Sequence, residues 1–192
     1  MLIDQIDDIL PQTQCRQCGC NGCRAYAEQI AAGAPINRCA PGGAAGIARL
    51  AALTGRPAVA LDPEYGHESA FAVAVIDADR CIGCRLCSAA CPVGAITGAP
   101  KHLFAVIEAQ CTGCALCIAP CPMDCIQMQE DGTVWNEERA RKARTAYRER
   151  LERQKQTRER IAAERTHSAQ TKKAVMADVM ARVRALSSAR NP

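Results

Sequence analysis

Apolar residues recur at helical spacing in the first part of the chain. Within residues 2–10 they follow a helical repeat, and Pro11 comes next, so the pattern predicts a short helix that ends before this proline. Similar patterns predict helices over 24–32 and 44–53, separated by a stretch rich in glycine and proline. Residues 1–54 are therefore predicted to form a small helical, loop-rich domain.

The pattern changes after residue 54. Residues 55–70 are rich in glycine, proline and charged side chains, which is typical of a linker. Residues 71–77 alternate valine with alanine, and residues 103–108 form a second apolar run, so both are predicted strands. Each of these strands precedes a dense group of cysteines by a few residues.

The two cysteine groups are copies of one sequence. Residues 81–96 read CIGCRLCSAACPVGAI and residues 111–126 read CTGCALCIAPCPMDCI, with nine of sixteen positions identical. Each half is expected to contribute a strand, a loop and a brief helix. The repeat therefore predicts a compact α+β domain with approximate two-fold symmetry over residues 71–132.

The remaining residues, 133–192, differ from the rest in charge. They contain 16 of the 24 Lys/Arg residues but only 7 of the 20 Asp/Glu residues. After Trp135 there is no glycine and only the terminal Pro192, so we predict a long basic helical tail on the outside of the protein. Near its end an apolar face is predicted, formed by Val175, Met176, Val179, Met180, Val183 and Leu186.

Three interpretations of this tail remain open. It is a solvated helix, or it docks on a protein partner or an anionic membrane surface, or it binds nucleic acid. The last is the least favoured, because beyond Trp135 only Tyr147 is available to stack on bases. We therefore expect no nucleic-acid partner.

Composition favours metal ligands over disulfides. The chain has 14 cysteines among 192 residues and only 3% aromatic residues, so metal ligation is the expected supplement to a limited apolar core. Asp4, Asp7 and Asp8 argue against a secretory signal, and no apolar run is long enough to span a bilayer. We therefore expect a cytoplasmic protein with no transmembrane segment, in which disulfides are rare.

Each copy of the repeat has the spacing C-x2-C-x2-C-x3-C-P, which is the signature of two-cluster bacterial ferredoxins. In this arrangement the proline redirects the chain, so the fourth cysteine of each run binds the other cluster. Gly83 and Gly113 are predicted to allow tight turns beside the clusters. Zinc is the alternative, although zinc sites use paired C-x2-C units. The predicted [4Fe–4S] ligands are Cys81, Cys84, Cys87 and Cys121 for one cluster, and Cys91, Cys111, Cys114 and Cys117 for the other.

The first domain offers five candidate ligands where one cluster needs four. Cys15, Cys18 and Cys23 have the spacing C-x2-C-x4-C, and Cys39 follows later in the chain. On spacing alone, Cys20 can replace Cys18 or Cys23. Zinc is also a stronger rival here than in the repeat, because the spacing is less diagnostic.

With these motifs the chain resembles the B subunit of the Rnf (or Rsx) electron transport complex. The resemblance rests on DDILPQTQCRQCGCNGCRAYAE, INRCAPGG and the two repeat segments, and it covers about residues 3–130. Members of that family usually begin with a membrane-spanning helix, so the resemblance implies a soluble variant that lacks this anchor. Tyrosine usually occupies the position of Cys20 in the family, which implies that Cys20 is not a ligand. The first cluster is then held by Cys15, Cys18, Cys23 and Cys39.

The implied function is single-electron transfer through three [4Fe–4S] clusters, with redox proteins and other Rnf subunits as partners. The implied location is the cytoplasm or the cytoplasmic face of the inner membrane. No phosphate loop, dinucleotide loop or nucleophile motif indicates a substrate site, so enzymatic activity is expected only within an ion-translocating oxidoreductase complex. Cys125 is predicted to be a small buried residue. The competing hypothesis is a binding protein with structural clusters, whose basic tail engages a protein or nucleic acid.

Overall fold

The computed structural model describes residues 1–130 and 132–188, with side chains through residue 184. Leu186, predicted on the apolar face of the tail, lies outside the described side chains. The chain divides into two compact units, and the boundary falls between Arg150 and Leu151. All cysteines belong to the first unit.

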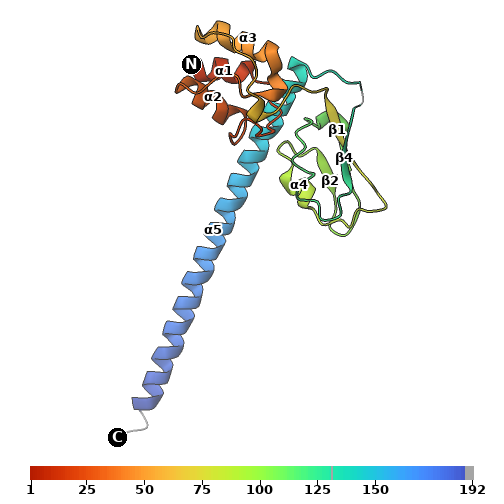
Figure 1. Cartoon of the computed structure of the whole chain (residues 1–192). Coiled ribbons are helices and arrows are strands. Elements are labelled where there is room, and N and C mark those ends of the chain that lie inside the picture. Colours follow the sequence, from red (N-terminus) through yellow and green to blue (C-terminus); the bar gives the residue numbers. More distant parts are fainter. Residues whose placement is uncertain (131, 189–192) are drawn as a thin grey trace. The chain divides into compact units, whose positions relative to one another are not determined.

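Three helices form the N-terminal part of the first unit (Figure 1). They lie where the sequence predicts them, and α1 packs on both α2 and α3. Their apolar faces meet in a core around Ile6, Tyr26, Ile30 and Leu50. The helices are α1 (Leu2–Ile9), α2 (Cys23–Ala31) and α3 (Gly43–Thr54), and short 3-10 turns lie at η1 (Ala40–Gly42), η2 (Pro63–Tyr65) and η3 (Glu108–Gln110).

The repeat region consists of two small antiparallel sheets rather than one. β1 (Ala72–Ile76) pairs with β4 (Ile126–Glu130), and β2 (Ile96–Gly98) pairs with β3 (Phe104–Val106). β1 and β3 confirm the two predicted strands. β2 and β4 were not predicted, although the alternation of apolar and polar residues in β4 is a strand signal. The mixture of helices and sheets confirms an α+β class.

Only the first copy of the repeat forms the predicted brief helix, α4 (Leu86–Ala90). There the N–H of Cys91 donates to the carbonyl four residues earlier, as in an α-helix. In the second copy the N–H of Cys121 donates to the carbonyl only three residues earlier, and the segment forms turns. Pro120 explains the difference, because it has no N–H and disfavours helical backbone at the preceding residue. The helix predicted for the second half is therefore wrong.

The long helix α5 (Glu137–Ser188) begins in the first unit and continues through the second. Its first turns pack on both parts of the first unit. Ala143 belongs to the core of the repeat region, and Arg144 and Arg148 pair with Asp7 of α1. The tail predicted to begin at residue 133 thus starts with segments that pack against the cysteine-bearing part. The predicted domain boundaries stay predictions.

The described part of the second unit is the rest of α5, and it confirms a helical C-terminal segment. Every described side chain from Leu151 to Arg184 is exposed. Among the residues that the structure describes, no helix combines the length and apolar character needed to cross a membrane.

Candidate metal centres

Three small cavities in the first unit are each lined by four cysteines that the sequence analysis grouped together. The three cavities are similar in size. None of the three is lined by Cys20, and the third is also lined by Cys125. The first cavity is lined by Cys15, Cys18, Cys23 and Cys39, the second by Cys91, Cys111, Cys114 and Cys117, and the third by Cys81, Cys84, Cys87 and Cys121.

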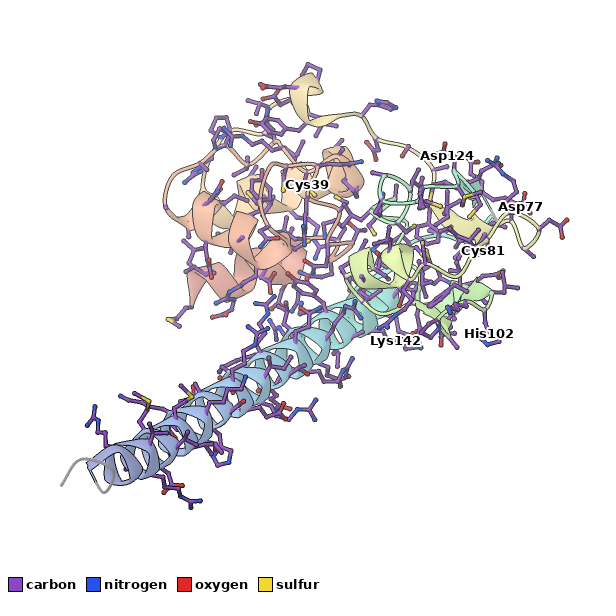
Figure 2. All side chains as sticks on the ribbon, turned by 90° about the horizontal axis from the view of Figure 1, so that it is seen from below. Cys39, Asp77, Cys81, His102, Asp124 and Lys142 are labelled. Atoms are coloured by element: carbon purple, nitrogen blue, oxygen red, sulfur yellow. The ribbon has the colours of Figure 1, made fainter. Side chains whose placement is uncertain are left out.

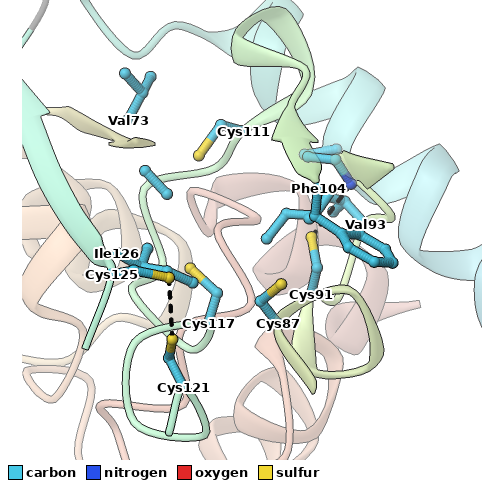
Figure 3. Packing of buried hydrophobic residues seen from close by; sticks show 14 residues of the cluster. Val73, Cys87, Cys91, Val93, Phe104, Cys111, Cys117, Cys121, Cys125 and Ile126 are labelled. Carbon is cyan, nitrogen blue, oxygen red and sulfur yellow. Dashed lines mark hydrogen bonds between the residues drawn. The ribbon is translucent and has the colours of Figure 1, made fainter. Parts of the chain in front are cut away.

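The fourth cysteine of each repeat run lies in the cavity of the other run. Cys121 lines the cavity of the first run, and Cys91 lines that of the second. Figure 3 shows Cys87, Cys91, Cys111 and Cys117 inside the core of this region, beside Val73 and Phe104. Figure 2 shows Cys39 among the N-terminal helices and Cys81 in the repeat region. Cys91 and Cys121 thus each lie among the cysteines of the other run, and the crossed assignment of cluster ligands stays a prediction.

The loop that carries Cys15 has an unusual backbone. Gln12, Gln14 and Arg16 all adopt left-handed φ values, between 57° and 66°. Non-glycine residues rarely adopt this conformation, so surrounding contacts must hold it in place. Gln14 supplies one such contact, because its Oε1 accepts a hydrogen bond of 2.9 Å from the backbone N–H of Cys23. This bond joins the loop to the first residue of α2.

Side chains from distant parts of the sequence hold the carbonyl groups of the same loop. The Nε1 of Trp135 donates to the carbonyl of Pro11 at 2.8 Å, and the hydroxyl of Thr112 donates to the carbonyl of Thr13 at 2.9 Å. Thr112 follows the ligand candidate Cys111 and is only 2% exposed. The first and second cavities therefore have walls that are joined by a hydrogen bond.

A series of polar contacts, buried from Asp7 onward, leads from α5 to the first cavity. Arg148 pairs with the carboxylate of Asp7 at 3.2 Å, and the Nε2 of Gln12 donates to the same carboxylate at 3.0 Å. The Nε2 of Gln14 in turn donates to Gln12 at 2.9 Å. Asp7 is only 2% exposed, so its charge is stabilised by these donors. Because Gln14 also accepts a hydrogen bond from the N–H of Cys23, this series of contacts reaches a candidate ligand.

The chemistry of the first cavity fits a cationic, polynuclear guest. Burial raises the pKa of Cys18 to about 11 and that of Cys23 to about 12. Buried thiolates therefore need a nearby cation, which iron supplies. Thr13 lines the cavity, and its hydroxyl is buried with no hydrogen-bond partner among the described residues. Such a hydroxyl is a donor for the sulfur atoms of a bound cluster.

The two repeat loops have the same backbone conformation at matching positions. Gly83 and Gly113 have φ values of 68° and 67°, as the glycines of a tight turn. A Cβ atom at Gly83 would lie 2.5 Å from the carbonyl oxygen of His102, and one at Gly113 would lie 2.8 Å from that of Ala72. Both loops therefore require glycine here, which confirms the predicted turns.

Backbone N–H groups point at the sulfur atoms of the two crossing cysteines. The N–H of Ala95 donates to the Sγ of Cys91 at 3.2 Å. Burial raises the pKa of Cys121, but the N–H groups of Cys125 and Met123 outweigh burial and place this pKa below the usual value. Hydrogen bonds from backbone N–H groups thus stabilise negative charge at both sulfur atoms.

Cys125 is buried as predicted, but it also contacts a candidate ligand. Its Sγ is 3.4 Å from the Sγ of Cys121 (Figure 3). Burial and the contact with Cys121 raise the pKa of Cys125 to about 11. Sequence reasoning missed this contact, although the spacing of four residues after Cys121 was visible.

The second and third cavities differ in their exposure to solvent. Cys117 in the second is buried, and burial raises its pKa to about 12. Cys84 in the third is exposed, beside the exposed side chains of Ile82 and Met123. Within the described residues, no three His, Cys, Asp or Glu side chains are placed to hold a single metal ion. Each group of four cysteines lines one cavity, which is the arrangement expected of the ligands of a cubane cluster.

Comparison with known proteins agrees with this geometry. Residues 74–128 match a family described as a 4Fe-4S dicluster domain, and residues 10–41 match one described as a putative Fe-S cluster. The chain is thus an iron–sulfur protein by family, and the two matched segments contain the three cavities' cysteines.

Relatives share much of the sequence. The chain is 58% identical over 129 residues to the B subunit of the ion-translocating oxidoreductase complex of Azoarcus sp., covering 67% of this chain and 70% of that protein. The proteins of the same name from Aliivibrio salmonicida and Hahella chejuensis are 59% and 57% identical, covering 66% and 55% of this chain. The chain spans between 54% and 70% of the length of these relatives. It belongs to the family of B subunits of ion-translocating oxidoreductase complexes.

Proposed function

We propose that the chain carries single electrons through three [4Fe–4S] clusters, one in each of the three cavities. The observation that carries the proposal is the separation of twelve of the 14 cysteines into three groups of four around cavities of similar size. Each group supplies the four thiolates that one cubane needs. Cys20 and Cys125 are the two cysteines left over.

A bound cubane supplies reversible one-electron chemistry, without a bond to any substrate. The residues of the chain then decide where the added charge is stabilised. The N–H groups that point at Cys91 and Cys121 favour the more negative, reduced state. The apolar core around Cys117 keeps water away from the second cavity, which disfavours added charge there.

We further propose that the electron partners are other subunits of an ion-translocating oxidoreductase complex. The support is the name of the relatives, which are subunits of such a complex. The proposed location is the cytoplasm or the cytoplasmic face of the inner membrane. The exposed Cys84, with Ile82 and Met123 beside it, is the most accessible point for exchange with a redox protein.

The proposal is tested by purifying the chain without oxygen and measuring iron, acid-labile sulfide and zinc. Electron paramagnetic resonance then follows reduction by dithionite. About twelve irons per chain with reducible cubane signals is the expected result. About eight irons would mean that the first cavity holds no [4Fe–4S] cluster, and zinc without sulfide would overturn the proposal. Clusters that stay inert under dithionite would favour the structural role instead.

The partner proposal needs a separate measurement. An affinity-tagged chain is expressed in its own cells, and detergent-solubilised membranes are searched for subunits that co-purify with it. Recovery of membrane-embedded subunits is the expected result. If the loaded chain is recovered without any such subunit, the electron carrier remains but its membership in the complex is rejected.

A further inference from the structure

The last described turns of α5 concentrate apolar side chains on an exposed helix. Between residues 151 and 170, only Leu151 and Ile161 are exposed large apolar residues. Five more follow within a few turns, and each has between 48% and 62% of its surface exposed. No described residue of the second unit covers them. We call this set the apolar face of the tail, and it consists of Val175, Met176, Val179, Met180 and Val183.

The apolar face is broad. At about 100° per residue, its five side chains span an arc of about 140° around the helix axis. A two-stranded coiled coil needs only the narrower seam of a and d positions, sustained over several heptads. Upstream of Lys172 the same seam would be filled by charged side chains and alanines such as Arg165 and Ala162. The pattern therefore suits burial against a wide surface better than pairing with a second copy.

Basic residues flank this face. On the same wheel, Lys173 and Arg184 lie at one margin of the arc. Arg182 lies at the other margin, where it pairs with Asp178 at 2.9 Å. Lys172 lies on the line of the face itself, one turn before Val175 and Met176. Long basic side chains at such margins extend from an apolar surface toward water and phosphate groups. The segment 171–184 contains four Lys/Arg residues and a single acidic residue, Asp178, so its net charge is +3. The opposite side of the helix is mostly alanine.

We propose that the apolar face of the tail binds the surface of an anionic lipid bilayer, with the helix lying in the plane of the interface. An apolar face with Lys and Arg beside it is the pattern of such helices. Methionines at two of the five positions suit a partner without fixed shape, because their side chains are flexible. The basic margins favour binding to anionic headgroups over neutral ones. The proposal goes beyond electron transfer and does not depend on the number of clusters.

The test uses the full, cluster-loaded chain and flotation of lipid vesicles. Vesicles of equal parts phosphatidylglycerol and phosphatidylcholine are compared with vesicles of phosphatidylcholine alone, each at low and high salt. The chain is expected to float with the anionic vesicles and much less with the neutral ones. Binding to the anionic vesicles should weaken at high salt, because the basic margins are screened.

Two variants with the same change of charge distinguish the contribution of the apolar face to binding from the contribution of net charge. Val183→Glu places a carboxylate within the apolar face and is expected to weaken binding about tenfold or more. Ala181→Glu places the same charge on the alanine side and is expected to weaken binding by less than about threefold. Glutamate is a better helix former than valine and only a little poorer than alanine, so circular dichroism should show an unchanged helix in both variants.

Three results would overturn the proposal. The first is equal binding by the two variants, and the second is equal binding to neutral and anionic vesicles. The third is a dimer in analytical ultracentrifugation that Val183→Glu dissociates, since the face would then join two copies. Iron content and dithionite reduction are measured on the same samples, so a failure of lipid binding is distinguished from a failure of electron transfer.

Discussion

Cys20 and Cys23 are neighbours in sequence but have different surroundings. Cys23 lines the first cavity, whereas the Sγ of Cys20 contacts the Oε1 of Gln29 at 3.2 Å. We expect Cys20→Ala to retain about twelve irons per chain and Cys23→Ala to retain about eight. Iron and sulfide analysis of the two variants, with the native chain as reference, checks the prediction. Iron loss on replacing Cys20 would mean that this cysteine is a ligand.

The Thr13 hydroxyl provides a second test at the scale of one residue. A donor toward the cluster stabilises the negative charge that reduction adds, so its removal makes reduction harder. We expect Thr13→Val to lower the potential of the first cluster by roughly 40 mV, the equivalent of about 1 kcal/mol for one electron. Potentiometric titration followed by electron paramagnetic resonance measures this shift. Thr13→Ser keeps the hydroxyl and serves as the control, and an equal shift in both variants would contradict the role of the hydroxyl.

At the scale of secondary structure, local patterns predicted most of the elements. The spacing of apolar residues identified α1, α2 and α3 because each buries one face in the same core. It missed β2, which is only three residues long, and β4, which pairs with β1 about 50 residues earlier in the sequence. It also assigned a helix to the second repeat, where Pro120 prevents one. The two copies of the repeat are therefore more alike in sequence than in secondary structure.

The groups of cysteines were predictable for a similar reason. Spacing within a run decides which thiols share a cavity, and the proline after Cys91 or Cys121 sends the fourth thiol to the other one. The contacts of Thr112 and Trp135 with the loop of the first cavity were not predictable. They join residues about 100 positions or more apart, and no local pattern records such a pairing.

The link between α1 and α5 can be tested through Asp7. Asp7→Asn removes the buried charge that Arg148 and Gln12 contact, and leaves Arg144 with a weaker partner. We expect a loss of stability of about 1–3 kcal/mol, which lowers the unfolding midpoint by several degrees. Thermal unfolding of the anaerobic, loaded protein measures it. Asp8→Asn is the matched control, because Asp8 is 66% exposed and its pairing with Arg144 should contribute little.

At the scale of the whole molecule, the division at residue 150 predicts unequal resistance to proteases. The exposed α5 segment from Leu151 on contains many Lys and Arg residues, whereas Arg144 is largely covered. Brief trypsin treatment of the loaded chain is expected to remove this segment first and to leave a fragment with unchanged iron content. Mass spectrometry and iron analysis identify the fragment. Loss of iron in step with the first cuts would show that the segment supports the cluster-bearing part.

The exposure of Cys84 also has a consequence for how the protein ages in air. Cys84 at the third cavity is exposed, whereas none of the four cysteines at the second cavity is exposed. With clusters in both cavities, we therefore expect oxygen to attack the one in the third cavity first. Because Cys121 belongs to the second run but lines the third cavity, loss of a cluster there would also free one end of the neighbouring loop. The proposed crossed ligands would thus connect the decay of the two repeat halves.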